Sequence, residues 1–438
     1  MLTELRSFDG TESIQAEFVR PDRYSHLFGA LTEGSRIIPR GAGLNYCAAS
    51  AGVGIRSVSS LLFNRILDFD SKGGRIVVEP GIRLGDLYRF TVQRGWILGV
   101  MPGHPSITVG GCIACNVHGK NHRREGNFIN VVESLTLFHP DHGEIICSPE
   151  HEQEVFRLTV GGFGLTGYIT SARLRLERLW GSGMLVRRIA VPDLTETVRT
   201  MEAEGEGAEL LHSWNNFNLR SEAFGAGFVY VGRSLENGVS DSAEFKQLSP
   251  EGLRRLPVSA YAGLVTRAML RAYSWSERLH CREKVVSLAT AIFPPHGKEF
   301  YFGLFGRKGF REYQLLVPRL RWKDAEEALP GLIRRHNVPI TLGSLKLFHG
   351  RAQLLNFDGM GVCVTVDAPE GEQTRGLFND LDELTLAVGG IVNLAKDSRV
   401  SAAFAQRVFP GYEDFKARLA AYSPRRRFDS ALRMRLDV

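Results

Sequence analysis

Residues 40–46 read Arg40-Gly41-Ala42-Gly43-Leu44-Asn45-Tyr46 and follow the strand-like run 36–39. Only glycine lets several main-chain N–H groups come close to one diphosphate, so clustered glycines indicate a phosphate-binding turn. Two more clusters follow, Gly110-Gly111 and the stretch 161–167. The first cluster lacks the GxGxxG spacing of a nicotinamide-type Rossmann domain, which is therefore disfavoured. The three clusters predict a diphosphate site built from separate loops.

The chain has 438 residues, which exceeds the usual size of a single core and predicts two domains. Its composition, 43% hydrophobic and 23% charged, is that of an ordinary globular protein. The arginines are scattered, so we expect no nucleic-acid partner. No stretch of 18 apolar residues and no apolar N-terminal segment occur, and we expect a cytoplasmic protein. Six cysteines do not make a disulfide scaffold, which favours a reducing compartment.

Local patterns predict alternating short strands and helices. In the first part we expect strands at 36–39, 61–63, 75–79 and 168–176, helices at 84–94 and 152–159, and a hairpin of 134–138 with 144–147. Further on we expect strands at 184–191, 208–214, 340–348 and 361–366, a strand-rich stretch at 299–317, and helices at 193–204, 322–336, 374–388 and 404–422. This order predicts an α+β fold with a mainly antiparallel sheet in the second domain. We expect domain 1 to cover residues 1–179 and domain 2 residues 180–390, with residues 391–438 returning to domain 1.

Five ordered motifs carry a family resemblance: residues 40–46, Pro102-Gly103, residues 108–111, His118-Gly119-Lys120-Asn121-His122, and residues 164–167. In this order they resemble the PCMH-type FAD-binding domain of the vanillyl-alcohol-oxidase superfamily. The motif 118–122 and the late segment Ala395-Lys396-Asp397-Ser398 resemble the decaprenylphosphoryl-β-D-ribose 2′-oxidase group of that superfamily. The resemblance is dense in 36–178 and 390–438 and patchy between them. It implies FAD held between two α+β subdomains and facing a separate substrate domain.

The resemblance also implies which residues contact FAD. Those expected are Pro39, Arg40, Gly41, Ala42, Gly43, Leu44, Asn45, Tyr46, Cys47, Ala48, Ala49, Gly103, Thr108, Val109, Gly110, Gly111, Cys115, Asn116, Val117, His118, Gly119, Lys120, Gly167, Ile169 and Asn393. Leu44 or Asn45 stands where family members with covalent FAD have a histidine, so we expect non-covalent flavin. Asn393 replaces a tyrosine that is usual near the flavin.

Lys396, Lys346 and His118 are the expected catalytic residues, again from the resemblance. An ammonium near the ring would stabilise anionic reduced flavin, and a desolvated lysine could move protons. Taken alone, each lysine is more simply a solvated surface charge. The expected substrate contacts are Trp214, Gln314, Cys363 and Thr365. Thr365 replaces a pocket cysteine, Cys363 a neighbouring asparagine, and Ile292 a tyrosine.

The resemblance implies oxidation of a carbohydrate hydroxyl to a ketone, with FAD as acceptor of a hydride. One reading is oxidation of the 2′-hydroxyl of a polyprenyl-phosphate pentose in glycan or cell-wall biosynthesis. A partner short-chain reductase would then complete an epimerisation. The alternative is an oxidase or dehydrogenase of a soluble sugar, alditol or nucleoside-like substrate. A third reading is a flavin-binding protein without activity.

Two further patterns have competing readings. Cys112, Cys115, His118 and His122 are spaced C-x2-C-x2-H-x3-H, a formal zinc set, but the glycines among them favour a backbone–ligand contact, so no metal is expected. A redox C-x-x-C pair lacks thioredoxin-like context. The stretch 252–285 alternates basic with apolar residues. It predicts either a basic amphipathic helix that meets the membrane and admits a lipid-phosphate substrate, or a surface helix packed by its apolar stripe.

Overall fold

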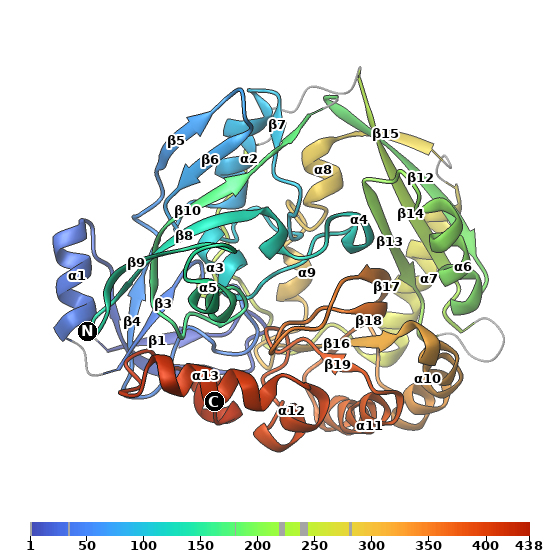
Figure 1. Cartoon of the computed structure of the whole chain (residues 1–438). Helices are drawn as coiled ribbons and strands as arrows, with labels where there is room; N and C mark the ends of the chain where they lie inside the picture. Colours follow the sequence, from blue (N-terminus) through green and yellow to red (C-terminus); the bar gives the residue numbers. More distant parts are fainter. Residues whose placement is uncertain (1, 34–35, 180, 219–223, 237–243, 280–282) are drawn as a thin grey trace.

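The computed structural model describes residues 2–33, 36–179, 181–218, 224–236, 244–279 and 283–438. In these ranges it contains four sheets of four or five strands and one two-stranded ribbon, with helices packed between and outside them (Figure 1). Most strand pairs are antiparallel. The expected α+β class is confirmed.

The first sheet has the order β1-β2-β4-β3, and its β3 leads directly into the glycine loop. Its β2–β4 and β3–β4 pairs are parallel, whereas β1–β2 is antiparallel. Helix α1 packs beside it. The bounds are β1 Leu2–Arg6, β2 Ser13–Val19, α1 Tyr24–Glu33, β3 Ile37–Arg40 and β4 Arg56–Ser59.

The second sheet is antiparallel throughout, with the order β5-β6-β10-β8-β9. Short helices follow its strands; α3 carries the second glycine cluster, and the third lies in the turn after α5. The bounds are β5 Ile66–Asp70, β6 Arg75–Val78, α2 Leu84–Val92, α3 Val109–Ala114, α4 His122–Glu125, the 3-10 turn Phe128–Val131, β8 Val132–His139, β9 Gly143–Cys147, α5 Gln153–Thr159 and β10 Tyr168–Arg175. The ribbon pairs β7 Trp96–Ile97 with β11 Glu177–Arg178.

Two antiparallel sheets form the other half, with the orders β13-β14-β12-β15 and β17-β18-β16-β19. Their bounds are β12 Gly183–Val191, β13 Leu210–Asn215, β14 Gly227–Leu235, β15 Glu283–Ser287, β16 Phe310–Pro318, β17 Leu342–His349, β18 Met360–Pro369 and β19 Ile391–Val392. The edge strands β13 and β17 meet through Ser213, whose hydroxyl accepts from Leu345 N at 2.8 Å and whose carbonyl accepts from Ser344 Oγ at 2.7 Å. These contacts join the two sheets edge to edge.

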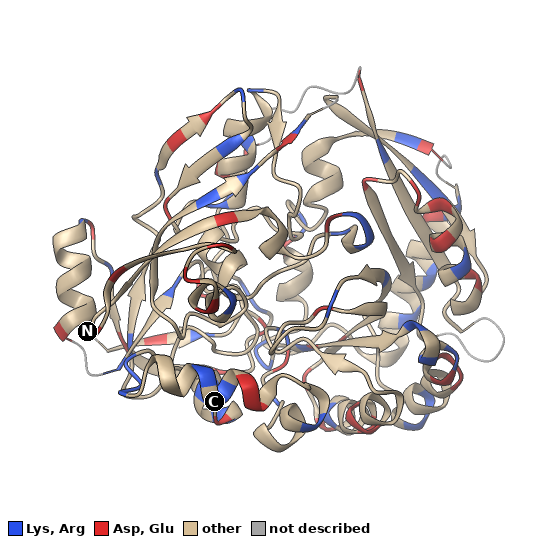
Figure 2. Ribbon diagram, in the orientation of Figure 1, with Lys and Arg blue, Asp and Glu red and all other residues tan. Residues whose placement is uncertain are grey.

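Helices α6, α10 and α11 pack against these two sheets, whereas α7 and α9 line the cavity described below. Figure 1 shows α10, α11, α12 and α13 in a row beside β16–β19. The bounds are α6 Leu194–Glu204, α7 Gly263–Leu279, α8 Leu288–Ile292, α9 Phe300–Gly303, the 3-10 turn Arg319–Arg321, α10 Trp322–His336, α11 Glu372–Val388, α12 Ala402–Val408, α13 Tyr412–Tyr422 and α14 Ala431–Leu436. Figure 2 shows basic and acidic residues mixed over α6, α10 and α11.

The C-terminal segment reaches back to the first sheet. Ile37 N donates to Arg427 O at 2.9 Å, and Asp429 N donates to Ile37 O at 3.0 Å. Ala431 N donates to Ala51 O at 2.8 Å. The last residues of the chain therefore stabilise the strand that precedes the glycine loop. The domain boundaries at 179 and 390 stay a prediction.

Three local predictions were wrong. Residues 61–63 form a turn and coil, and the strands lie on either side at β4 and β5. Part of 299–317 is helical, since α9 precedes β16 there. The expected closing helix 404–422 is two helices, α12 and α13, because Pro410 cannot donate the main-chain hydrogen bond that a continuous helix needs. The remaining predicted elements agree with the structure to within a few residues.

Candidate functional site

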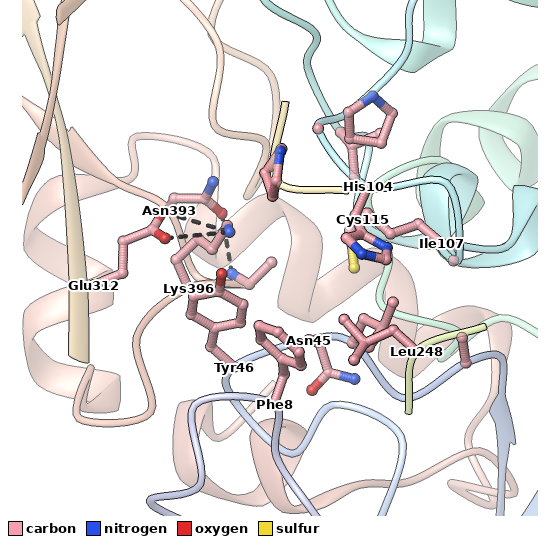
Figure 3. A pocket seen from close by; sticks show the side chains of 18 of the residues that line it. Phe8, Asn45, Tyr46, His104, Ile107, Cys115, Leu248, Glu312, Asn393 and Lys396 are labelled. Atoms are coloured by element: carbon pink, nitrogen blue, oxygen red, sulfur yellow. Dashed lines mark hydrogen bonds and ion pairs between the residues drawn. The ribbon is translucent and has the colours of Figure 1, made fainter. Parts of the chain in front are cut away.

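A cavity of about 750 Å³ lies between the glycine loops and the sheet of β16, β17 and β18. Its walls come from the loop after β3, the start of α3, the turn after α5, and the inner face of β16–β18. Helix α7 and the segment 294–304 line a further side. Figure 3 shows side chains from these separate elements converging on it.

The glycine loop forms one wall of the cavity and carries unpaired main-chain N–H donors. Ala42, Gly43, Leu44 and Asn45 line the cavity, and within the described part of the chain their main-chain N–H groups donate to no protein acceptor. Consecutive unpaired N–H groups bind anions. Gly43 has a φ of +71°, which favours glycine. A Cβ on Gly41 would lie 2.2 Å from Thr108 Oγ1, so only glycine lets the two loops approach so closely.

Asn45 fixes the shape of this loop. Its Oδ1 accepts from Ala49 N at 3.1 Å, and its Nδ2 donates to Ser50 Oγ at 3.2 Å. Arg40 also donates to Ser50, at 3.0 Å, and pairs with Glu251 at 3.2 Å. Burial lowers the pKa of Arg40, which supports the loop from beneath. These bonds hold the loop open toward the cavity.

Most of the expected cofactor contacts line the cavity. They are Pro39, Gly41, Ala42, Gly43, Leu44, Asn45, Tyr46, Ala49, Gly103, Thr108, Gly110, Gly111, Cys115, Asn116, Val117, His118, Gly167, Ile169 and Asn393. The structure thus brings together residues from six separated segments. Thr108 caps α3 by accepting from Gly111 N.

Six expected cofactor contacts lie outside the cavity lining: Arg40, Cys47, Ala48, Val109, Gly119 and Lys120. Cys47 and Val109 are fully buried in hydrophobic clusters, because alternate positions of a packed loop or helix face inward. Ala48 turns the chain at a φ of +45°. Lys120 lines a neighbouring cavity of about 80 Å³. Burial and the Lys346 ammonium lower the pKa of Lys120 to about 7.

His118 and Lys346 meet on the cavity wall. Lys346 Nζ lies 3.5 Å from His118 Nδ1 and 3.5 Å from Gly119 O. Burial and the nearby ammonium hold the pKa of His118 well below its usual value, so this imidazole is neutral. Burial also lowers the pKa of Lys346. The pair offers a neutral imidazole beside a desolvated lysine.

Lys396 is held by an aromatic ring and a carboxylate. Its Nζ lies 3.8 Å from the centre of the Tyr46 ring and 3.4 Å from a carboxylate oxygen of Glu312. Gln314 Nε2 donates to Glu312 Oε1 at 2.6 Å, and Asn393 Nδ2 donates to Gln314 Oε1 at 2.7 Å. Figure 3 shows Glu312, Asn393 and Lys396 together on one side of the cavity. The surface-charge reading of Lys396 and Lys346 is wrong, since both line the cavity.

The expected substrate contacts divide into two pairs. Trp214 and Gln314 line the cavity, whereas Cys363 and Thr365 do not. Cys363 lies opposite Lys346 and Leu316, and Thr365 lies opposite Gln314. Paired residues of an antiparallel sheet share a face. The short side chains therefore lie on the cavity face but end beneath their longer neighbours. Burial raises the pKa of Cys363 to about 12.

Sequence reasoning missed two acidic residues of the cavity, Glu312 and Asp367. Glu312 precedes Gln314 by two positions, and Asp367 follows Thr365 by two, so the period of a strand places them on the same face. That alternation was the available signal. His104, Tyr301 and Thr341 also line the cavity and were not singled out.

Helix α7 forms an apolar side of the cavity with Thr266, Met269, Leu270 and Tyr273. The same helix exposes large apolar side chains outward, notably Leu264, Trp275 and Leu279, which are 80%, 67% and 64% exposed. The predicted helix over 252–285 is present only at 263–279, since 252–262 are turn and coil and 283–285 belong to β15. Residues 280–282 lie outside the described residues. In the described ranges, no helix combines the length and apolarity needed to cross a membrane.

The formal zinc set is not assembled as a cluster. Cys112 is buried in the core, while Cys115 and His118 face the cavity. His122 stacks on Phe348 and lies 3.1 Å from Asp358 Oδ1. Over the described ranges, no three His, Cys, Asp or Glu side chains are placed to hold a metal ion.

Comparison with known proteins agrees with this geometry. Residues 29–148 match the FAD binding domain family. The decaprenylphosphoryl-beta-D-ribose oxidase of Mycolicibacterium smegmatis is 27% identical over 421 residues, 93% of this chain and 91% of that protein. A Streptomyces coelicolor protein, printed as "Uncharacterized protein in mprA 5'region", is 26% identical over 82% of this chain and all of its own length. The mitochondrial L-galactono-1,4-lactone dehydrogenase of Arabidopsis thaliana is 28% identical over 40% of this chain and 29% of its own.

The chain is an FAD-dependent oxidoreductase with a PCMH-type FAD-binding domain, as the matched domain and the full-length similarity show. The free main-chain donors of 42–45 and the close approach at Gly41 fit the diphosphate of FAD. Bound FAD accepts a hydride from a carbon–hydrogen bond. Non-covalent attachment of the flavin stays a prediction.

Proposed function

We propose that the enzyme oxidises the 2′-hydroxyl of a polyprenyl-phosphate pentose to a ketone, as the oxidative half of an epimerisation. One observation carries the proposal: beside the diphosphate loop, the same cavity has basic side chains, Lys396 and Lys346, and an apolar side formed by α7. The lysines suit a sugar and its phosphate, and the apolar side suits a lipid tail. The similarity to the mycobacterial oxidase over 93% of the chain supports the same substrate class.

In the proposed roles, Lys346 and Lys396 hold the anionic and hydroxyl groups of the substrate. Neutral His118 accepts or donates a hydrogen bond at the sugar. Trp214 and Gln314 orient the ring from β13 and β16. Cys363 and Thr365 act from beneath, by setting the positions of Lys346 and Gln314.

Membrane contact belongs to the same proposal. The exposed apolar residues of α7 share the helix with Arg267, Arg271 and Arg278. Apolar side chains that enter an interface, next to basic ones that meet anionic headgroups, are typical of peripheral membrane helices. We propose that α7 contacts the inner face of the membrane and passes the lipid into the cavity. A short-chain reductase would take the keto product.

The second candidate function is oxidation of a soluble sugar, alditol or nucleoside-like substrate. It is favoured by the polar side of the cavity, where Glu312, Gln314, Asn393 and Lys396 form a hydrogen-bonded row suited to a polyol. The partial similarity to L-galactono-1,4-lactone dehydrogenase supports a sugar-derived substrate of this kind.

Anaerobic titration of the purified yellow protein tests both. We expect prenyl-phosphoribose to bleach the flavin absorbance, and free pentoses, alditols and nucleosides to leave it oxidised. Bleaching by a free polyol and not by the prenyl-phosphate sugar would establish the second function. A flavin that only dithionite reduces would support a binding protein without activity.

A further inference from the structure

Glu312 on β16 and Asp367 on β18 lie directly opposite each other in the sheet, and both line the cavity. Side chains at such paired positions have Cβ atoms about 5 Å apart. The two residues are 5% and 2% exposed, so little water separates their charges. Two adjacent carboxylates in such a place cannot both ionise without a large electrostatic cost.

Among the described residues, Lys396 forms an ion pair with this pair of acids. Lys396 Nζ lies 3.4 Å from Glu312 and balances one negative charge. Glu312 also accepts from Gln314, whereas Oδ1 of Asp367 is buried with no hydrogen-bond partner in the described part of the chain. Burial and the Glu312 carboxylate hold the pKa of Asp367 well above its usual value.

The other basic group close to the pair is Lys346 on the neighbouring strand β17. The Glu312 carboxylate favours its charged form, whereas burial lowers its pKa. Tyr46 and Tyr301 face the pair from the glycine loop and α9, and burial raises the pKa of both far above its usual value, so they stay neutral. Asp9 lies further along the same side, near Tyr46.

We propose that Glu312 and Asp367 share one proton and together accept the proton of the substrate hydroxyl. This rests on the assignment of an alcohol as substrate. The hydroxyl O–H bond breaks and its proton goes to the pair, the adjacent C–H bond breaks with its electron pair passing as hydride to FAD, and a C=O bond forms. The pair then holds two protons and returns one to solvent.

The pair suits this role for a physical reason. Burial makes a carboxylate a stronger base than a hydrated one, because its charge is less solvated, and the proton already held by the pair keeps its negative charge at one. The Lys396 ammonium balances the one negative charge of the carboxyl pair before the proton of the substrate hydroxyl arrives. The sequence missed the arrangement because Glu312 and Asp367 are 55 residues apart in number and meet only through the register of β16 with β18.

Infrared spectroscopy of the oxidised holoenzyme tests the shared proton without turnover. At neutral pH we expect a protonated-carboxyl band that shifts in D2O and is lost in Asp367→Asn, in addition to the band of Glu125, whose pKa burial raises to about 8. If Asp367→Asn removes no protonated-carboxyl band, the proposal is overturned, whatever the substrate. Flavin absorbance reports whether each variant folds and keeps its cofactor.

Stopped-flow reduction of the flavin tests the proton transfer, using whichever alcohol bleaches the wild-type enzyme. Glu312→Gln should lower the reduction rate constant by about 10²- to 10⁴-fold, the usual contribution of a general base. Substrate dissociation constants should change much less. Asp380→Asn, which removes an α11 carboxylate paired with Arg335 and His336 away from the cavity, is the control and should reduce at the wild-type rate.

Failure of the alcohol oxidation and failure of the carboxyl pair as proton acceptor give different experimental results. If no alcohol reduces the wild-type flavin, the assigned oxidation fails, and the infrared band still decides whether the proton is shared. If an alcohol reduces wild type and Glu312→Gln equally fast, the oxidation stands and the carboxyl pair is not the acceptor.

Discussion

The ammonium of Lys396 lies 3.8 Å from the centre of the Tyr46 ring, so a cation from the C-terminal segment packs on an aromatic side chain of the glycine loop. Tyr46 N also donates to Ala395 O at 3.1 Å. A cation over an aromatic face is worth about 0.5–2 kcal/mol, more when desolvated. The two contacts connect the phosphate-binding loop to the far end of the chain at the cavity.

Replacement of Lys396 should show whether the charge or the size of its side chain matters for flavin reduction. Lys396→Met keeps the length but removes the charge, leaving Glu312 without its cation, and should slow flavin reduction by roughly 10- to 100-fold, about 1.4–2.7 kcal/mol. Stopped-flow absorbance measures the rate. Lys396→Arg retains the cation and should recover most of the loss; equal rates in wild type and Lys396→Met would show that the charge plays no part.

Asn45 should govern cofactor affinity. Asn45→Ala removes the acceptor for Ala49 N and the donor to Ser50, so the loop loses its shape and its free amides lose their alignment. Loss of such hydrogen bonds costs about 1–2 kcal/mol, which corresponds to a 5- to 30-fold weaker FAD complex. Fluorescence titration of apoprotein with FAD measures this. Asn45→Asp keeps the acceptor but sets a negative charge beside the diphosphate, and should lose at least as much affinity as Asn45→Ala.

His139 should make the protein less stable in acid. Its ring is fully buried, and burial lowers its pKa from 6.5 to about 4. The unfolded chain therefore binds a proton at a pH where the native ring stays neutral, and stability falls as pH drops from about 6.5 toward 4. At pH 5 the loss from this residue is about 2 kcal/mol relative to pH 7.

Urea unfolding at pH 7 and pH 5 measures that loss. His139→Asn keeps an acceptor for Asp141 N, which donates to His139 Nδ1 at 3.1 Å, but cannot titrate. The variant should therefore lose about 2 kcal/mol less between the two pH values than wild type does. Identical pH dependence in both proteins would contradict burial as the cause.

The exposed face of α7 should bind anionic membranes. Trp275→Glu and Leu279→Glu place charges where apolar side chains would enter the interface, and should abolish flotation with vesicles containing phosphatidylserine at low salt. Leu320→Glu is the matched control, because Leu320 is 97% exposed and lies outside α7. Absence of wild-type flotation would refute the membrane role and favour a soluble substrate.

Local sequence patterns predicted most of the elements and the glycine loops. The glycine clusters at 41–43, 110–111 and 161–167 were identifiable because close backbone approach demands glycine, whereas the other expected contacts in 39–49 and 115–118 came from the family resemblance. The wrong predictions lie where two local patterns conflict. Residues 61–63 are apolar, as in a strand, but form a turn and coil between β4 and β5, and Pro410 interrupts the helical pattern of 404–422. The substrate side was harder, since Cys363 and Thr365 share the cavity face yet end beneath Lys346 and Gln314.

The sequence by itself predicted a diphosphate site built from glycine turns, because close main-chain approach depends on backbone freedom that consecutive residues carry. The tertiary structure alone decided which charged side chains meet. Glu312, Asp367 and Lys396 come from three segments, and their proximity follows from strand register and the return of the C-terminal segment. Electrostatic coupling depends on distance and burial, and neither is encoded within a short stretch of chain.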